Sequence, residues 1–313
     1  MSAARTDPIT MQRQRGIAAV MALLVVALVA SLATSLIWQQ SLMLRQMQNL
    51  SARAQIREIA RAGAAWTTAI LASDSAQIDA LNEPWALTLP PVEVERATLS
   101  GGLADESGRF NLNNLVQSGN AIEPQIAAFR LVLAHVGLPA NLADALTDWM
   151  DADAVVRPGG GAEDSYYLAL DPPYHAANRP LSTLGELRLV RGFGARELTL
   201  LAPLVSVLPA TTSINVNTMP GDLLAALVPE APNQSVLAGR QTSPFQNAQA
   251  FLQLLPEESR SRLAGLVAVN SAYFSAHAVV TQDRARIAYR AILQRNSTQG
   301  NWPNVLSFHE EPL

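Results

Sequence analysis

The chain of 313 residues contains neither cysteine nor lysine. Without cysteine it can form no disulfide bond and no thiolate zinc site. Without lysine it can use neither Schiff-base chemistry nor the lysine of a Walker phosphate-binding loop. All 22 cationic side chains are therefore arginine, and with 26 acidic residues the net charge is −4. This balance predicts no large basic surface for nucleic acid.

Charge and enzyme motifs are also scarce. Only 15% of the residues are charged and 49% are hydrophobic, so the chain can bury the core of one large or two ordinary domains. Its four histidines are scattered, with no H-E-x-x-H pair for zinc, and no G-x-S-x-G nucleophile elbow occurs. A carboxylate pair such as Asp151 and Glu163 could serve sugar hydrolysis, which is the weaker alternative. We expect a protein that is not an enzyme.

An apolar segment without any charge occupies residues 17–37. As a helix it would be about 31 Å long, which matches the core of a bilayer and exceeds the ~7–15 apolar residues of a cleaved Sec signal. Arg5, Arg13 and Arg15 precede the segment, and the next cation is Arg45. The sequence therefore predicts a single membrane anchor with a cytoplasmic N-terminus and the bulk of the chain on the other side.

The anchor should continue as a helix beyond the membrane. No helix breaker interrupts residues 17–62, and apolar residues recur at spacings of three and four as far as Ile70. We expect one helix ending near Asp74, with its second half packed on a globular head.

The rest of the chain changes its pattern twice. Alternation after Pro84 predicts a β-hairpin that turns at Gly101–Gly102, and residues 121–265 predict short helices. From residue 266 onward, AYFSAHAVV, ARIAYRAILQR and NVLSF predict strands. A helical domain inserted into a sheet domain explains this order better than two domains in tandem.

Two short motifs resemble each other, and a third resembles a helix-hairpin-helix. RFNLNNL (109–115) and SINVNT (213–218) share alternating apolar and asparagine residues, whose amides can bond the nearby backbone. LRLVRGFGARELTLL (187–201) resembles a helix-hairpin-helix unit that turns at Gly192-Phe193-Gly194. Such units often bind DNA, but the acidic composition favours a packing role here.

The densest polar cluster is TDWMDADAVVRPGGGAEDSYYLALDPPYHAANRP (147–180), which also contains Asp171 and Asn178. Carboxylates this close repel one another unless solvent or a cation lies between them. The turn at residues 158–161 could bring both ends of the loop together, and carboxylate oxygens at adjustable distances suit calcium. A solvated acidic loop is the alternative. The candidate ligands are Asp148, Asp151, Asp153, Glu163 and Asp164.

These features resemble one family. RQRG (13–16) before IAAVMALLVVALVASL, followed by a long helix, resembles the N-terminus of type IV pilin-like proteins. SGRFNLNNL, the segment from DWMDAD to LRLVRG, and INVNT are similar to the K-type minor pseudopilins of type II secretion systems, over essentially the whole chain.

The resemblance implies an α+β fold: a pilin-like long N-terminal helix packed on an antiparallel β-sheet, with a large inserted all-α domain that contains helix-hairpin-helix-like units. It implies that prepilin peptidase cuts after Gly16 and methylates Ile17. The implied parts are a leader (1–16), a transmembrane segment (17–37), a periplasmic helix (38–73), first strands (74–120), the inserted helical domain (121–265) and last strands (266–313).

The resemblance also implies a position in the assembly. Most pilins carry glutamate as the fifth mature residue, whereas this chain has Met21, and K-type members resemble it in lacking the glutamate. A glutamate in a bilayer is costly unless a neighbouring subunit pairs with it, and a tip subunit has no such neighbour beyond it. The implied partners are I- and J-type minor pseudopilins, secreted substrates and the secretin, with structural calcium in the acidic loop. The alternative is a membrane-anchored helix-hairpin-helix protein that binds DNA.

Overall fold

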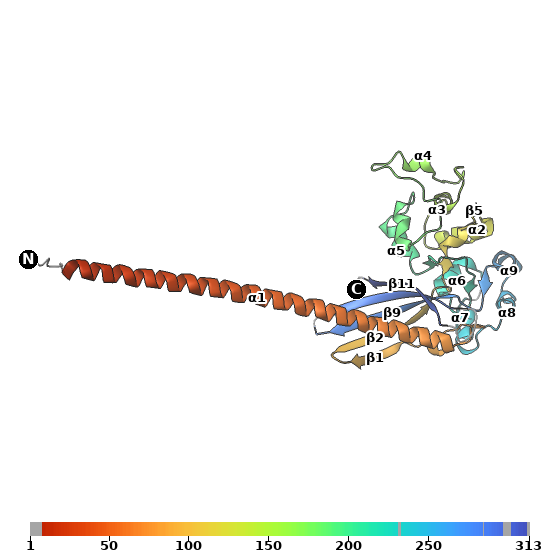
Figure 1. The fold of residues 1–313 in the computed structure, drawn as a ribbon. Coiled ribbons are helices and arrows are strands. Elements are labelled where there is room, and N and C mark those ends of the chain that lie inside the picture. The colour runs from red at the N-terminus through yellow and green to blue at the C-terminus, as the bar shows by residue number, and fades with distance from the viewer. Residues whose placement is uncertain (1–7, 231–232, 284, 297–301, 312–313) are drawn as a thin grey trace, which may run out of the picture. The chain divides into compact units, whose positions relative to one another are not determined.

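The structure is a computed structural model, and it describes residues 8–230, 233–283, 285–296 and 302–311. The chain divides into two compact units, Met1–Glu58 and Ile59–Leu313. Helix α1 (Pro8–Ser73) begins in the first unit and ends in the second (Figure 1). The prediction of one uninterrupted helix that ends near Asp74 is therefore confirmed.

The first unit is helix α1 up to Glu58. From Ile17 to Leu50 its apolar side chains are exposed, including Leu23, Trp38 and Leu50. The helix that starts at Ile17 is long and apolar enough to cross a membrane. Such exposure is unfavourable in water and favourable in lipid, so the first unit fits a single-pass anchor.

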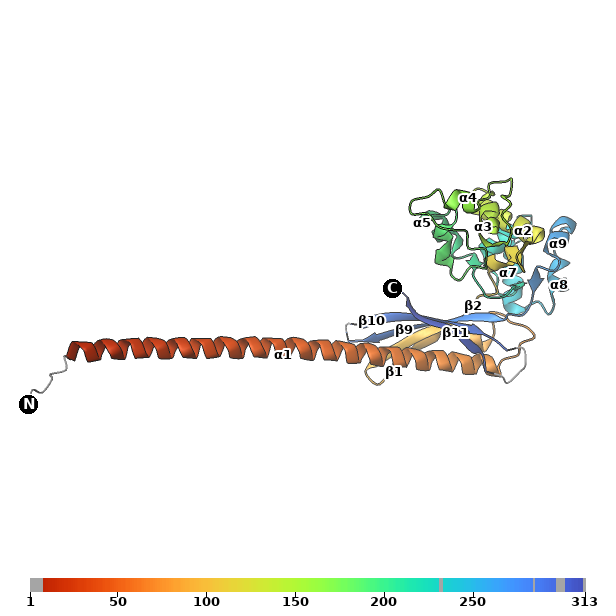
Figure 2. The same ribbon diagram turned by 45° about the horizontal axis from the view of Figure 1, so that its top comes forward.

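The second unit contains a five-stranded antiparallel sheet in the order β1-β2-β9-β10-β11. Its strands are β1 (Leu89–Val94), β2 (Ala97–Asp105), β9 (Tyr273–Gln282), β10 (Ala285–Gln294) and β11 (Asn304–Glu311). The last turns of α1 lie across this sheet (Figure 2) and pack Ala64 and Leu71 with Trp85, Phe274 and Leu293. The implied pilin-like packing of helix on sheet is confirmed.

The predicted turn at Gly101–Gly102 is wrong. Both glycines lie inside β2, and the chain reverses between Val94 and Ala97, where Glu95 has a φ of 56°. A Cβ on Gly101 would lie only 2.0 Å from the carbonyl oxygen of His277 on β9. Glycine in the strand therefore permits a close approach of the neighbouring backbone and does not mark a turn.

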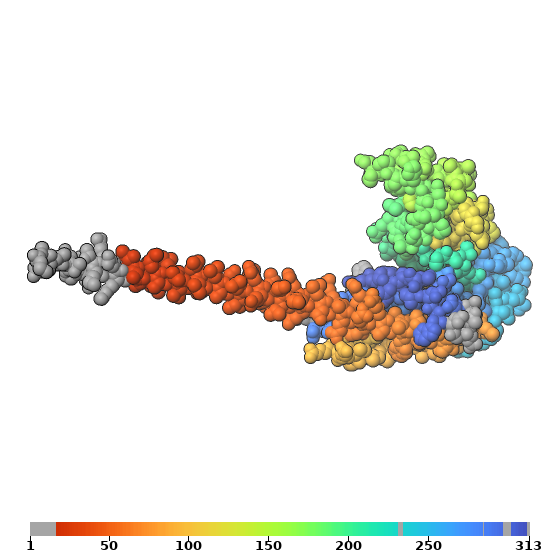
Figure 3. All heavy atoms as spheres, in the orientation of Figure 1, coloured from red at the N-terminus to blue at the C-terminus, as the bar shows by residue number. Residues whose placement is uncertain are grey.

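An inserted helical domain separates β2 from β9, which are neighbours in the sheet. Figure 3 shows the residues of this domain, coloured from yellow through green to light blue, gathered in one body. Its helices are α2 (Glu123–His135), α3 (Leu142–Met150), α4 (Asp164–Tyr167), α5 (Ala195–Leu201), α6 (Gly221–Leu227), α7 (Asn233–Thr242), α8 (Ala248–Leu252) and α9 (Glu257–Leu263), with 3-10 helices η2 (Leu112–Leu115) and η3 (Leu184–Leu189). A further 3-10 helix, η1 (Pro84–Ala86), precedes β1.

The two asparagine motifs occupy equivalent places in this domain. Strand β3 (Phe110–Asn111) pairs in parallel with β6 (Val205–Ser206), and β7 (Ile214–Asn215) pairs in parallel with β8 (Val267–Ala268). A short hairpin, β4 (Val116–Gln117) and β5 (Asn120–Ala121), follows the first motif. The Asn111 and Asn215 side chains accept bonds from the backbone two residues later, at 3.2 and 3.0 Å. The expected local bonding is confirmed for these two, but Asn113 and Asn217 instead donate to backbone distant in the sequence, at Leu181 and Leu208 and at Phe245.

Candidate metal centre

Four of the five candidate carboxylates come together at the end of α3. Asp148 lies in the last turn of that helix, Asp151 and Asp153 follow it, and Glu163 immediately precedes α4. One oxygen each from Asp151, Asp153 and Glu163 lies within 4.8 Å of the others. Asp148 lies outside this group of three, but near enough for its charge to raise the pKa of both Asp151 and Glu163.

Three of these carboxylates are buried without complete partners. Asp148, Asp151 and Glu163 are 0%, 3% and 4% exposed. Each has one buried oxygen with no hydrogen-bond donor: Oδ1 of Asp148, Oδ1 of Asp151 and Oε1 of Glu163. A buried carboxylate oxygen without a donor is strongly unfavourable, and a cation is one group that could satisfy these three.

The electrostatics of the group lead to the same conclusion. Burial, and after it the charge of the neighbouring carboxylates, raises the pKa of Glu163 to about 7 and that of Asp151 to about 6. Burial also raises the pKa of Asp148, although the backbone N–H and the charge of Arg157 oppose the rise. A divalent cation would reverse these shifts, because it favours the ionised form of each ligand.

The glycine run explains how the loop folds onto α3. A Cβ on Gly159 would lie 2.1 Å from Oδ2 of Asp144, and one on Gly161 would lie 2.0 Å from Oδ2 of Asp148. Only glycine permits this approach of the loop backbone to the helix. The loop is held there by Arg157, whose side chain binds Asp144 at 3.1 Å and whose backbone N–H binds Asp148 at 3.1 Å.

Asp164 lies apart from the other four. Its carboxylate is bonded to Nδ1 of His175 at 2.7 Å and accepts the backbone N–H of Ala176 at 2.9 Å. Its side chain is 43% exposed, and the bond to His175 lowers its pKa. Its oxygens are thus already bonded within the protein, unlike those of its neighbour Glu163.

The set of donors fits calcium. The three grouped side chains, Asp151, Asp153 and Glu163, offer only carboxylate oxygens, and the nearby Asp148 adds another carboxylate. Hard oxygen donors at flexible distances match the preference of Ca²⁺, whereas zinc favours histidine and cysteine. Asp148, Asp151, Asp153 and Glu163 are the residues that would hold the ion.

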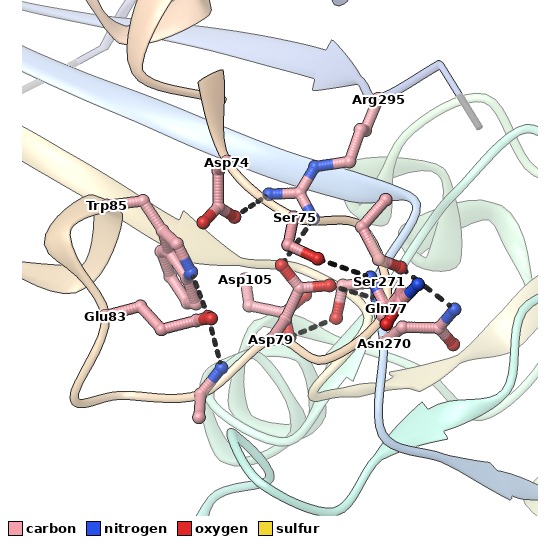
Figure 4. A network of polar contacts seen from close by, with 12 residues as sticks. Asp74, Ser75, Gln77, Asp79, Glu83, Trp85, Asp105, Asn270, Ser271 and Arg295 are labelled. Carbon is pink, nitrogen blue, oxygen red and sulfur yellow. Dashed lines mark hydrogen bonds and ion pairs between the residues drawn. The ribbon is translucent and has the colours of Figure 1, made fainter. Parts of the chain in front are cut away.

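A second acidic group, which the sequence did not indicate, contains Asp74, Asp79 and Glu83. Arg295 donates to Asp74 at 2.6 Å and to Asp79 at 2.5 Å (Figure 4). Glu83 accepts bonds from the Trp85 indole and the Ala80 amide at 2.7 and 2.8 Å. An arginine therefore already supplies the positive charge that a metal ion would bring. Arg295 and Asp79 are 216 positions apart in the sequence, so no local sequence pattern reveals the pair.

The N-terminal candidates lie in the first unit. Gly16, Ile17 and Met21 are all in helix α1, and the Ile17 and Met21 side chains are exposed. The structure thus places the expected cleavage point at the start of the apolar segment.

Comparison with known proteins gives the family. Two family models described as type II secretion system protein K match residues 108–210 and 214–270. The protein K of Pseudomonas aeruginosa is 33% identical over 90% of this chain and 89% of its own length. The chain belongs to the type II secretion system protein K family. Protein K of Aeromonas hydrophila is 31% identical, covering 88% of this chain and 92% of the relative.

A solved structure shares the fold. A chain from the crystal structure of the GspK–GspI–GspJ complex of enterotoxigenic Escherichia coli matches 86% of this protein K and 100% of its own length. The TM-score is 0.75 at 24% sequence identity, so the two chains share a fold.

Proposed function

We propose that this protein K caps the tip of the type II secretion pseudopilus and helps to initiate its assembly, for export of folded proteins across the outer membrane. It does so as a structural subunit and not as an enzyme. The anchor lies in the inner membrane with the N-terminus in the cytoplasm and the bulk in the periplasm. The inserted helical domain is the part offered to secreted substrates and the secretin.

The observation that carries this proposal is Met21. In a filament, a glutamate at the fifth mature position is tolerable in lipid when a neighbouring subunit offers it a partner. A methionine requires no partner, which suits a subunit with no neighbour beyond it. The inserted helical domain supports the same position, because its bulk would obstruct the addition of another subunit.

The partners that we propose are I- and J-type minor pseudopilins. The related chain of similar fold was crystallised in a complex named for such components. The alternative, a DNA-binding hairpin, has less support because its turn is packed within the protein. Phe193 is buried, and a Cβ on Gly192 would lie 2.5 Å from the Leu142 side chain of α3.

Co-purification tests the proposed position. Tagged protein K, co-expressed with the I- and J-type pseudopilins of its own genome, is expected to retain both in detergent, whereas a tagged major pseudopilin retains less of them. Gold-labelled antibody against protein K is expected at one end of the pseudopilus. Label spread along the shaft, or failure to retain either partner, would contradict a tip position.

Processing at Gly16 is a separate prediction. Replacing Gly16 with leucine is expected to leave the precursor uncut by prepilin peptidase, because a side chain at that position prevents close approach of the enzyme to the backbone. The matched control is Thr10→Leu, which adds a similar side chain away from the junction. Gel mobility and mass of the N-terminus report cleavage, and normal processing of Gly16→Leu would refute the assignment.

We also propose that Asp148, Asp151, Asp153 and Glu163 bind a structural calcium ion. The three buried carboxylate oxygens without donors support this proposal. The ion would offset their mutual repulsion and join the end of α3 to the start of α4, and so stabilise the inserted helical domain.

A further inference from the structure

The turn between η3 and α5 contacts the acidic loop through Arg191. The backbone N–H of Arg191 donates to the Tyr167 hydroxyl at 3.3 Å, and its Nη1 donates to the Gly161 carbonyl at 3.1 Å. Its guanidinium carbon lies 4.8 Å from the centre of the Tyr166 ring. A single arginine thus contacts both the loop and α4, which follows Glu163.

The turn itself is shaped for this contact. Gly192 has a φ of 84°, which favours glycine, and its α-carbon faces Leu142 of α3. Phe193 is buried beside it. The hairpin-like motif is therefore packed against the helix that carries Asp148, and this packing holds Arg191 over the loop.

The hydrogen bond from Arg191 to the Gly161 carbonyl holds a stretch of backbone that lies beside the candidate ligand Asp148. The Gly161 carbonyl and the Ala162 N–H belong to one planar peptide unit, so fixing the carbonyl fixes the direction of the N–H. The same stretch of backbone lies against a candidate ligand, because a Cβ on Gly161 would lie 2.0 Å from Oδ2 of Asp148. Glu163, the next candidate ligand, is the following residue. Arg191 therefore constrains the backbone that connects Asp148 with Glu163.

We propose that Arg191 is a positioning residue for the cation site: it holds the Gly161–Ala162 peptide so that Asp148 and Glu163 face the ion, and it does not touch the ion itself. This inference rests on the proposed calcium binding. Residues that orient metal ligands by hydrogen bonds commonly change affinity by ~10–100-fold when removed. Because Arg191 acts on one peptide unit, we expect the lower end, about tenfold.

Calcium titration of the full-length protein in detergent tests the proposal. Wild type, Arg191→Met, Arg191→Lys and Arg188→Met are compared by calorimetry with CaCl2. Arg188 is a matched control, since it is an exposed arginine three residues earlier, in η3. Arg191→Met should bind Ca²⁺ about tenfold more weakly, Arg191→Lys should recover part of the loss because lysine keeps a donor, and Arg188→Met should match wild type.

A second measurement separates positioning from general stability. In the calcium-free protein, amide exchange of residues 157–163 should be faster in Arg191→Met, whereas exchange in the β-sheet should be unchanged. Wild-type affinity in Arg191→Met would overturn the proposal, and so would equal weakening in Arg188→Met. If Arg191→Met fails to fold, Arg191→Ala takes its place because alanine has no donor, and wild-type affinity together with unchanged loop exchange in that variant overturns the proposal. If wild type itself binds no Ca²⁺, the calcium proposal fails, and this one with it.

Discussion

Adding 1 mM Ca²⁺ to metal-free protein is expected to raise its melting temperature by about 5–10 °C. A ligand that binds only the native state at 100 times its Kd adds ~2.7 kcal/mol of stability. For a domain of this size, each kcal/mol corresponds to roughly 2–4 °C. The physical source is the relief of repulsion between Asp148, Asp151 and Glu163, whose free oxygens are buried without donors. Differential scanning calorimetry in detergent, with and without chelator, measures the shift.

Matched variants identify the ligands. Asp151→Asn combined with Glu163→Gln should abolish the response to Ca²⁺. Without metal, this variant should be at least as stable as wild type, because two buried charges have been removed. Asp164→Asn should keep the response, since that carboxylate is bonded to His175 and Ala176. An equal calcium shift in the double variant and in wild type would refute the site.

Replacing Arg295 with methionine is expected to destabilise the second unit by about 3–5 kcal/mol, because removing one partner leaves a buried charge without compensation. The Arg295 side chain is 4% exposed, and it binds both Asp74 and the fully buried Asp79. Methionine preserves much of the packing volume, so the loss reports the charge. Arg286→Met is the control, since Arg286 is an exposed arginine on β10, the strand that ends one residue before Arg295. Chemical denaturation measures both.

The pH dependence of Arg295→Met gives an independent test. Burial raises the pKa of Asp79 to about 7, against the opposing effects of Arg295 and the Ser271 amide. As the pH falls, a carboxyl with a raised pKa is protonated in the native state at a higher pH than in the unfolded state. The contribution of Asp79 to the free energy of unfolding therefore falls as the pH rises from about 4 through 7. Without Arg295 the pKa is higher still and the penalty at neutral pH larger. The stability difference from wild type should therefore narrow as pH falls from about 8 to 5, and a constant difference would contradict this account.

Local sequence patterns predicted the helices and strands well, but they did not predict where two segments of backbone approach each other closely. Periodicity identified α1 and strands β9 to β11, because long regular segments bury one face and so repeat their apolar residues at fixed intervals. The pair Gly101–Gly102 led to a wrong prediction of a turn, because glycine is also found where two strands approach each other closely. What decides between the two roles is the position of the His277 carbonyl on β9, a residue distant in the sequence.

At the acidic site, too, the sequence did not show which side chains come together. Composition brought together five candidate carboxylates within one segment, but Asp164 and Glu163 are adjacent and face different partners. Which of them points at the others depends on the path of a loop, and that path depends on how near Gly159 and Gly161 come to α3. No spacing rule contains this information.

The sequence by itself determined the anchor, the long helix, the order of helices and strands, and the family resemblance, because these depend on composition and on periodicity along the chain. Only the tertiary structure decided which carboxylates gather without donors, and which acidic group, at Asp74 and Asp79, already has its cation in Arg295. Burial and pairing between distant residues set the energy of a charge, and both exist only in the folded chain.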